Sequence, residues 1–296
     1  MLFGTHVSIA GGVFNAPENA AKVGCEVFQM FTRSPRGGTA PKLTKEIVKQ
    51  FKDSCKKHGF INYYVHAPYY INFASSNSFI ANSSIKIIRE ELERSSLLGV
   101  KAVMAHLGSA KDLGEKKAIK QTIAGLKKVL SGYKGSTEFL IEISAGSGNV
   151  IGDTFEEVSE ILEKLQATSY KFTPQNPNKV RICAGLQAKI GVCFDTAHAF
   201  ASGYDLRTKT QVEKTFKEFD KIIGFNNLAL IHGNDSKVDF NSRLDRHWHI
   251  GKGKIGLEGF RAIINHPKLK KLDMILETPD ETMDRKNIQT VKSLRQ

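Results

Sequence analysis

The stretch FNNLALIHGNDSKVDFNSRLDRHWHIGKGKIG, residues 225–256, decides how this 296-residue chain is read. An apolar run of strand character ends abruptly on His232, and a polar loop follows it. That loop carries Asn234, Asp235, Asp245, His247 and His249. Imidazole and carboxylate without thiolate are typical ligands of a hydrolytic zinc or manganese site, in which some coordination positions stay open. A polar surface loop with chance histidines is the alternative, so the rest of the chain has to decide between them.

Short runs with β-strand character recur along the whole sequence, separated by patterns with helical periodicity. We expect strands at residues 2–8, 25–31, 62–66, 101–106, 138–142, 190–195, 227–232 and 272–277. Two capping boxes, Thr154–Glu157 and Thr210–Glu213, predict the starts of two of the helices between them. Sustained strand–helix alternation indicates parallel strands with crossover helices. Eight strands favour an α/β fold of the TIM (β/α)8 barrel type, and a doubly wound open sheet is the competing architecture.

The composition indicates a single domain over residues 1–296. No low-complexity tract or change in composition marks a boundary, and residues 167–185 read as a longer crossover loop. In a barrel of this kind the active site lies at the C-terminal ends of the strands.

Six consecutive predicted strands finish on a side chain that can ligate a metal. These residues are His66, His106, Glu142, Asp195, His232 and Glu277. In a parallel barrel their side chains would converge at one mouth. A single residue of this kind could cap the next helix. If capping explained all six, however, Ser, Thr and Asn would be expected among them as well. Six in succession therefore predict a metal site.

Further candidate ligands follow the sixth and seventh strands. His198 lies just past the sixth, while Asp245 and His247 form an i, i+2 pair that an extended loop can aim at one point. His249 shares that alternation but we favour His247, and His6 has no partner that the sequence identifies. Nine candidates exceed what one cation can use, so two or three cations with bridging carboxylates are expected. Clustered divalent cations with O and N ligands suit phosphoester hydrolysis.

The net charge of +13 predicts a polyanionic partner, such as nucleic acid, an acidic membrane surface or phosphorylated substrates. Residues that could hold a polyanion at the mouth are Arg36, Tyr69, Tyr70, Lys237 and Arg246. For Tyr69 and Tyr70, packing within their loop is an equal alternative. The run from Gly251 to Gly256 matches G-x-G-x-x-G, but it follows a polar loop rather than a strand, so we reject dinucleotide binding.

The four cysteines are scattered and form no C-x-x-C pair, which is typical of a reducing compartment. Neither a signal peptide nor an apolar run of about 18 residues is found. We therefore expect a cytoplasmic protein without membrane association.

Three segments together resemble the signatures of endonuclease IV, the family-2 apurinic/apyrimidinic endonucleases. They are HAPYYIN from His66, GVCFDTAH from Gly191, and HGNDS from His232 followed by SRLDRH from Ser242. The opening HVSIAGG from His6 and the late LETP from Leu276 are similar to that family too, so the resemblance runs from residue 3 to about 280.

The resemblance implies a TIM barrel with a trinuclear zinc cluster, in which Mn²⁺ is an alternative at one site. It implies an enzyme that cuts double-stranded DNA on the 5′ side of an abasic sugar and leaves a 3′-hydroxyl. Carried over by position, the first metal falls to His66, His106 and Glu142, and the second to Glu142, Asp195, His232 and Glu277. The third falls to His198, Asp245 and His247, and Glu142 becomes the catalytic residue that orients the attacking hydroxide.

Five positions depart from the family pattern. Tyr70 stands where an aliphatic residue is usual, Ile143 where Asn is common, and Asn241 where Gly precedes Ser242. Residues 37–38 are glycines where larger residues are often found, which leaves open how this loop fills the gap left by a flipped sugar.

We therefore predict a monomeric, metal-dependent AP endonuclease of base excision repair, cytoplasmic and associated with the nucleoid through DNA binding. Cleaning of 3′ ends is expected by resemblance only. One alternative is a sugar isomerase or epimerase on the same barrel, for which Asp245 and His247 would be surplus. The other is a nucleic-acid-binding protein that has lost catalysis.

Overall fold

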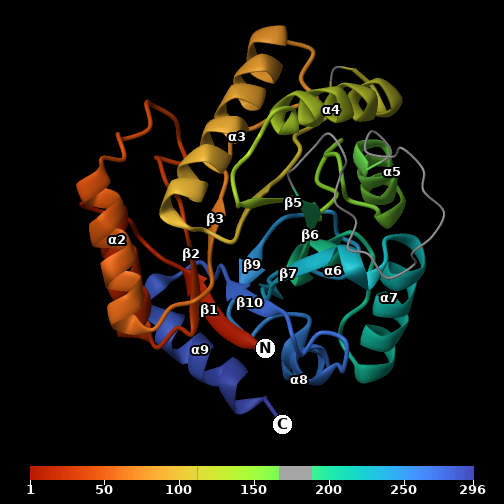
Figure 1. The fold of residues 1–296 in the computed structure, drawn as a ribbon. Helices are drawn as coiled ribbons and strands as arrows, with labels where there is room; N and C mark the ends of the chain where they lie inside the picture. Colours follow the sequence, from red (N-terminus) through yellow and green to blue (C-terminus); the bar gives the residue numbers. More distant parts are fainter. Residues whose placement is uncertain (112, 167–188) are drawn as a thin grey trace, which may run out of the picture.

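Eight parallel strands close into a barrel, as the sequence predicts (Figure 1). The structure is a computed structural model that describes residues 1–111, 113–166 and 189–296. The barrel strands are β1 Leu2–His6, β2 Val27–Met30, β3 Tyr63–His66, β4 Ala102–Ala105, β5 Glu138–Glu142, β6 Ile190–Asp195, β7 Leu228–His232 and β10 Asp273–Leu276. Each of the eight predicted strands is confirmed. The neighbours run β1-β10-β7-β6-β5-β4-β3-β2, so sequence order is kept around the ring and the open-sheet alternative is wrong.

Helices form the outer layer around the barrel (Figure 1). They are α1 Ala16–Val23, α2 Lys45–His58, α3 Ser78–Leu98, α4 Glu115–Leu130, α5 Phe155–Gln166, α6 Thr196–Ala201, α7 Lys209–Ile222, α8 Gly256–Asn265 and α9 Asp284–Ser293. None of the helices in the described part of the chain combines the length and the apolar composition needed to cross a bilayer. The predicted crossover loop at residues 167–185 lies outside the described residues.

Of the two predicted capping boxes, the first is formed in part and the second is not formed. Thr154 Oγ1 accepts from the backbone N–H of Glu157 at 3.2 Å, but the Glu157 carboxylate turns to the N–H of Gly152 at 2.7 Å. The second box is wrong, because α7 begins two residues earlier than predicted. Thr208 is its N-cap and accepts from the N–H of Gln211.

The hydrophobic core has two parts, as the barrel architecture requires. The larger part packs the outer face of the strands against the helices, with Phe28, Phe139 and Phe194 fully buried. The smaller part fills the barrel interior with inward side chains from seven of the eight strands, all but β1. Its members are Val27, Tyr64, Ala102, Met104, Leu140, Cys193, Leu230 and Ile275. The barrel interior is therefore filled by side chains below its C-terminal mouth.

One irregularity between β6 and β7 affects the mouth. Val192 pairs with Leu228 but Cys193 pairs with Leu230, so Ala229 is the extra residue of a bulge. Beyond the bulge the register places Asp195 directly opposite His232. Bulges re-aim side chains in this way near functional sites.

Candidate metal centre

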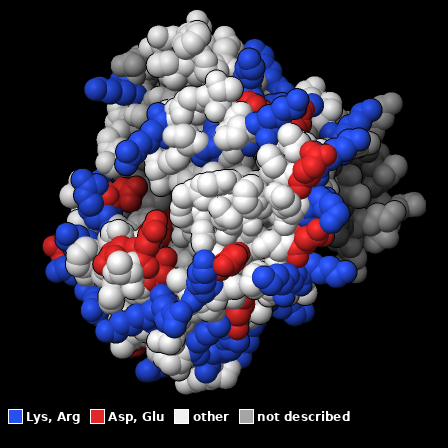
Figure 2. Space-filling view, turned by 90° about the vertical axis from the view of Figure 1, so that its left-hand side faces the viewer, with Lys and Arg blue, Asp and Glu red and all other residues white. Residues whose placement is uncertain are grey.

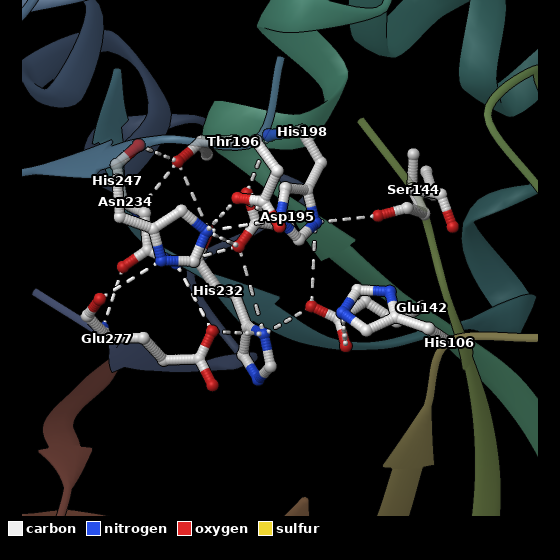
Figure 3. A network of polar contacts seen from close by, with 12 residues as sticks. His106, Glu142, Ser144, Asp195, Thr196, His198, His232, Asn234, His247 and Glu277 are labelled. Atoms are coloured by element: carbon white, nitrogen blue, oxygen red, sulfur yellow. Dashed lines mark hydrogen bonds and ion pairs between the residues drawn. The ribbon is translucent and has the colours of Figure 1, made fainter. Parts of the chain in front are cut away.

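The six predicted strand-end side chains gather at the C-terminal mouth of the barrel, and five of them, all but His66, are labelled in Figure 3. His66, Glu142, Asp195 and His232 are the last residues of β3, β5, β6 and β7, and His106 and Glu277 come directly after β4 and β10. His198 reaches the same place from the first turn of α6, and His247 from a short hairpin. The parallel register thus brings residues far apart in sequence to one point.

Three groups of side chains have donor atoms close enough to share a cation. Within each group these atoms lie within 4.8 Å of one another. The groups are His66–His106–Glu142, Glu142–Asp195–His232–Glu277 and Asp195–His198–His247. The described residues therefore offer imidazole and carboxylate donors in the proportions that zinc and manganese accept.

Asp245 also lies beside the third group. Its Oδ1 is 3.2 Å from His198 Nε2 and 3.6 Å from His247 Nε2, although its side chain is half exposed. The structure therefore brings together all nine residues that the sequence singles out as ligands. His249 turns away and contacts Asn287 at 3.2 Å, which favours His247 over it.

Glu142 joins the first two groups. Its Oε2 lies 2.8 Å from His66 Nε2 and its Oε1 lies 2.9 Å from His232 Nδ1, so the two oxygens face different histidines. Burial opposes the charged form, but His106, His232 and His66 outweigh it and hold the pKa of Glu142 well below its usual range. This carboxylate is therefore ionised and placed to be shared between two cations.

Backbone carbonyls fix the orientation of three histidine rings. The Nδ1 atoms of His66, His198 and His247 lie 2.7, 2.9 and 3.0 Å from the carbonyl oxygens of Ala67, Ile143 and Glu277. A carbonyl oxygen only accepts, so each Nδ1 carries a proton, and Nε2 is the atom that can present a lone pair to a cation in the mouth.

These lone pairs face acceptors, which is the observation that tests whether a cation fits. His198 Nε2 lies 3.1 Å from His247 Nε2 and 3.2 Å from Asp245 Oδ1. Three acceptors around one point require a proton or a cation between them. Burial disfavours a proton on His198, but Asp195 and Asp245 outweigh burial and raise its pKa to about 10. The carboxylates thus favour positive charge at this point, which a proton on His198 supplies in the metal-free protein and a divalent cation can supply in its place.

The hairpin that carries His247 is held by a buried carboxylate. Its strands are β8 Asp235–Ser236 and β9 His247–Trp248. Asp235 is fully buried and accepts from the backbone N–H groups of Gly251, Gly253, Ile255 and Gly256 at 2.9–3.4 Å. A Cβ at Gly253 would lie 2.5 Å from Asp235 Oδ1, so glycine is required there. The glycine-rich run thus binds a carboxylate of its own chain rather than a dinucleotide.

In the loop that precedes Asp245, two residues other than glycine adopt a left-handed backbone conformation. Asn241 has φ 57° and Arg243 has φ 55°, and their N–H groups donate to the carbonyls of Phe200 and Ala201. Asn tolerates this conformation better than most residues. The glycine expected before Ser242 is therefore replaced by asparagine, a residue that adopts the left-handed conformation with little strain.

The predicted polyanion contacts lie around the mouth but differ in exposure. Arg36, Lys237 and Arg246 are exposed, Tyr69 is 68% exposed, and Tyr70 is half-buried. Tyr69 lines a cavity of about 690 Å³ together with Phe31, His106, His198 and Glu277. Tyr69 also packs edge-on against Phe31, with ring centroids 5.4 Å apart.

The loop that carries Arg36 is tied to α3 by buried ion pairs. Arg33 Nε donates to Glu91 Oε1 at 2.6 Å, and Arg94 donates to the carbonyl of Thr32 at 2.8 Å. All three charged side chains are more than 90% buried. Lys and Arg are also spread over the face that carries α2, with smaller acidic groups among them (Figure 2).

Two further polar side chains of the mouth were not predicted from the sequence to belong to the site. Asn234 is fully buried, donates to Asp195 Oδ2 at 2.7 Å and accepts from the N–H of Glu277 at 2.7 Å (Figure 3). Gln29 is fully buried in β2 and contacts His232 and Glu277. Asn234 stands two residues after a ligand candidate and could have been suspected. Gln29 lies inside an apolar strand, where its inward position on the barrel was the only available signal.

Comparison with known proteins places the chain in context. The profile of the xylose isomerase-like TIM barrel family matches residues 17–296. The chain is 38% identical over 296 residues to a probable endonuclease 4 of Nitrosopumilus maritimus, covering 99% of each protein. It is 37% identical to a probable endonuclease 4 of Halothermothrix orenii, covering 100% of this chain and 99% of that protein.

Solved structures give a similar picture. Endonuclease IV from Thermus thermophilus superposes with a TM-score of 0.82 at 29% identity, covering 99% of this chain and 98% of that one. A D-tagatose 3-epimerase-like protein superposes with a TM-score of 0.70 at 18% identity, covering 99% and 97%. The second match shows a shared fold alone.

Proposed function

Because the chain belongs to the endonuclease IV family, we propose that it is a metal-dependent endodeoxyribonuclease of base excision repair. It hydrolyses the phosphodiester on the 5′ side of an abasic site in double-stranded DNA, leaving a 3′-hydroxyl and a 5′-deoxyribose phosphate. The observation that carries this proposal is the convergence of nine imidazole and carboxylate side chains on one mouth. One metal cannot use them all, and clustered cations suit phosphoester hydrolysis.

The side chains divide among three cations, for which we propose Zn²⁺, with Mn²⁺ as the alternative at one site. His66, His106 and Glu142 would hold the first, and Glu142, Asp195, His232 and Glu277 the second. His198, Asp245 and His247 would hold the third. Asp195 lies within 3.6 Å of His247 Nε2, so it stands between the second and third groups.

When bound, such cations lower the pKa of water and neutralise charge that develops on the phosphate. Glu142 is the proposed catalytic residue because its two oxygens face the first and second groups and its low pKa keeps it able to accept a hydrogen bond. It would orient the attacking water. The buried position of Glu142 keeps bulk water from competing for that hydrogen bond.

The rim residues would hold the DNA. The exposed Arg36, Lys237 and Arg246 are placed to contact phosphates, and Tyr69 and Tyr70 to fill the duplex or stack on bases. The abasic nucleotide would turn into the cavity that Tyr69 lines. That step costs least where no base is paired or stacked, which favours abasic sites over intact DNA.

We also infer, from the family alone, that the enzyme cleans 3′ ends, acts as a monomer and works in the cytoplasm near the nucleoid. A duplex with a blocked 3′ terminus tests the first of these, and sedimentation tests the second.

The central test is a duplex that carries one tetrahydrofuran abasic mimic, incubated with and without a chelator. The mimic cannot undergo β-elimination, so a cut must be hydrolytic. We expect chelator-sensitive cleavage on the 5′ side of the mimic with a 3′-hydroxyl product, and none in the undamaged duplex. An intact mimic duplex after loading with zinc or manganese would refute the proposal.

The same protein preparation separates the alternatives. About three equivalents of metal per chain support the nuclease, whereas one supports a sugar isomerase or epimerase on this barrel. A protein that binds DNA in a salt-sensitive manner but cleaves nothing after metal loading would be a binding protein without catalysis.

A further inference from the structure

Every barrel strand contributes one inward polar side chain at the level of the mouth. Six are the strand-end ligand candidates, and β1 and β2 contribute the other two, His6 and Gln29. Val27 lies in the barrel interior, and side chains two residues apart on a strand share a face, so Gln29 points inward as well. The polar ring is thus complete, and two of its members have no place in the ligand groups.

Gln29 contacts two of the candidate ligands directly. Its Nε2 donates to Glu277 Oε1 at 2.6 Å and lies 3.0 Å from His6 Nδ1, and its Oε1 lies 2.8 Å from His232 Nε2. An ionised carboxylate can only accept hydrogen bonds, so the amide nitrogen must face Glu277. The amide oxygen then faces His232, and the orientation of the amide is determined.

This orientation decides the protonation of the His232 ring. Since the Gln29 oxygen can only accept, His232 Nε2 carries a proton, and Nδ1 is the atom that can present a lone pair to a cation. That lone pair lies 2.9 Å from Glu142 Oε1 and 3.2 Å from Glu277 Oε2, within the second ligand group. His66, His198 and His247 are oriented by backbone carbonyls, whereas His232 depends on a side chain that a single substitution can remove.

We propose that Gln29 is a positioning residue of the metal centre. It holds His232 in the tautomer that offers Nδ1 to the cation, and it holds Glu277 by its other amide face. A residue needed only to fill the barrel would be apolar, as Met104 is on β4, because burying an amide is costly unless its hydrogen bonds are made. The inference rests on the proposed function, since it assumes that the second group binds a cation.

The variant that isolates this role is Gln29→Met, which keeps the length of the side chain and removes its hydrogen bonds. Loss of such a supporting contact typically weakens metal binding about 10- to 100-fold. Gln29→Ala is the second variant, for the case that Gln29→Met does not fold. The space left by alanine would admit a water molecule, which can donate or accept and so does not select one tautomer.

A matched control is Gln121→Met on α4. Gln121 Nε2 donates to the carbonyls of Phe73 and Ser75 at 2.7 and 2.8 Å, so the same substitution removes two hydrogen bonds that touch no ligand candidate. We expect this variant to lose thermal stability and to keep the zinc affinity of the unmodified protein.

Two measurements test the proposal. Zinc titration of the metal-free protein, in competition with a chromophoric chelator, should show one equivalent bound about 10- to 100-fold more weakly in the Gln29 variants. ¹⁵N spectra of the imidazole rings in the zinc-loaded protein should show His232 protonated at Nε2 in the unmodified protein and a mixture of tautomers in the variants. A folded Gln29 variant with both the original affinity and the original tautomer would overturn the proposal. Failure of the unmodified protein to bind zinc would instead refute the proposed function itself.

Discussion

Both ends of the barrel carry buried carboxylates, but the two ends differ in the groups that surround these carboxylates. At the N-terminal end, Asp273 Oδ2 accepts from Tyr64 Oη at 2.6 Å and from Asn62 Nδ2 at 2.8 Å, and Lys101 Nζ lies 3.5 Å away. At the C-terminal mouth, Glu142, Asp195 and Glu277 face histidine nitrogens, several of which present lone pairs.

The difference separates a structural carboxylate from a functional one. Asp273 has its donors from within the chain, so that end of the barrel is complete as folded. The mouth has acceptors facing acceptors, as at His198, His247 and Asp245, and only positive charge from outside the chain can complete it. Each prediction below changes one side of this comparison.

The largest effect is expected from Glu142→Gln at the mouth. The amide has nearly the same size but lacks the charge that joins the first two ligand groups. We expect cleavage of the abasic-mimic duplex to fall about a thousandfold or more, while duplex affinity in a gel-shift assay stays within about threefold. Turnover at the original rate would remove Glu142 from the mechanism.

The mirror substitution is Asp273→Asn at the other end. It weakens the charged hydrogen bonds from Tyr64 and Lys101, so we expect the free energy of unfolding to fall by about 1–3 kcal/mol. Urea denaturation measures that loss. Cleavage per folded molecule should be unchanged, and a loss of cleavage at full folding would mean that the two ends are coupled.

A third carboxylate, Asp284, sharpens the contrast because it is buried beside the mouth with the Thr278 hydroxyl as a donor at 3.2 Å. Burial raises the pKa of Asp284 to about 6. The folded protein therefore holds this proton more tightly than the unfolded chain, so stability falls as the pH rises from about 4 to above 6.

Asp284→Asn keeps an acceptor for Thr278 and removes the ionisation. At pH 8 we expect the free energy of unfolding of the variant to be about 1–2 kcal/mol larger than that of the unmodified protein. At pH 4 we expect the two free energies of unfolding to be nearly equal. Denaturation curves at the two pH values give the comparison. A difference that does not depend on pH would assign the effect to packing.

The smallest effect is expected at the rim. Arg36→Ala removes one proposed phosphate contact, so the slope of log affinity against log salt should become shallower by about one unit. Lys271→Ala, which removes an exposed charge just before β10 at the opposite end, is the matched control. Equal slopes for the two variants would mean that the Arg36 loop does not touch phosphate.

The barrel and its ligand candidates could be predicted because both follow from local patterns. Strand-type apolar runs have recognisable ends, and the residues at those ends converge whenever parallel strands close. The convergence of His66, Glu142 and His232 could be predicted without any interatomic distance, since the topology of the barrel places them together.

Other features depend on neighbours that the sequence does not reveal. Gln29 lies within an apolar strand, and its role appears only when β2 is set beside His232 and Glu277. Thr208 and Thr210 both offer hydroxyls, and the tertiary packing of α7 decides which one caps it. The bulge at Ala229, which sets Asp195 opposite His232, likewise has no local sequence signal.

The backbone amides of the glycine-rich run that donate to Asp235 have a consequence for how the site responds to metal supply. Concave rings of amides are how many proteins retain phosphate or cluster anions, and here the retained anion is an internal side chain. The hairpin that carries His247 therefore takes its conformation when the chain folds and does not need a bound metal ion to form. Depletion of zinc should leave a vacant receptor that is ready to refill, and recovery of activity would then be limited by the arrival of ions.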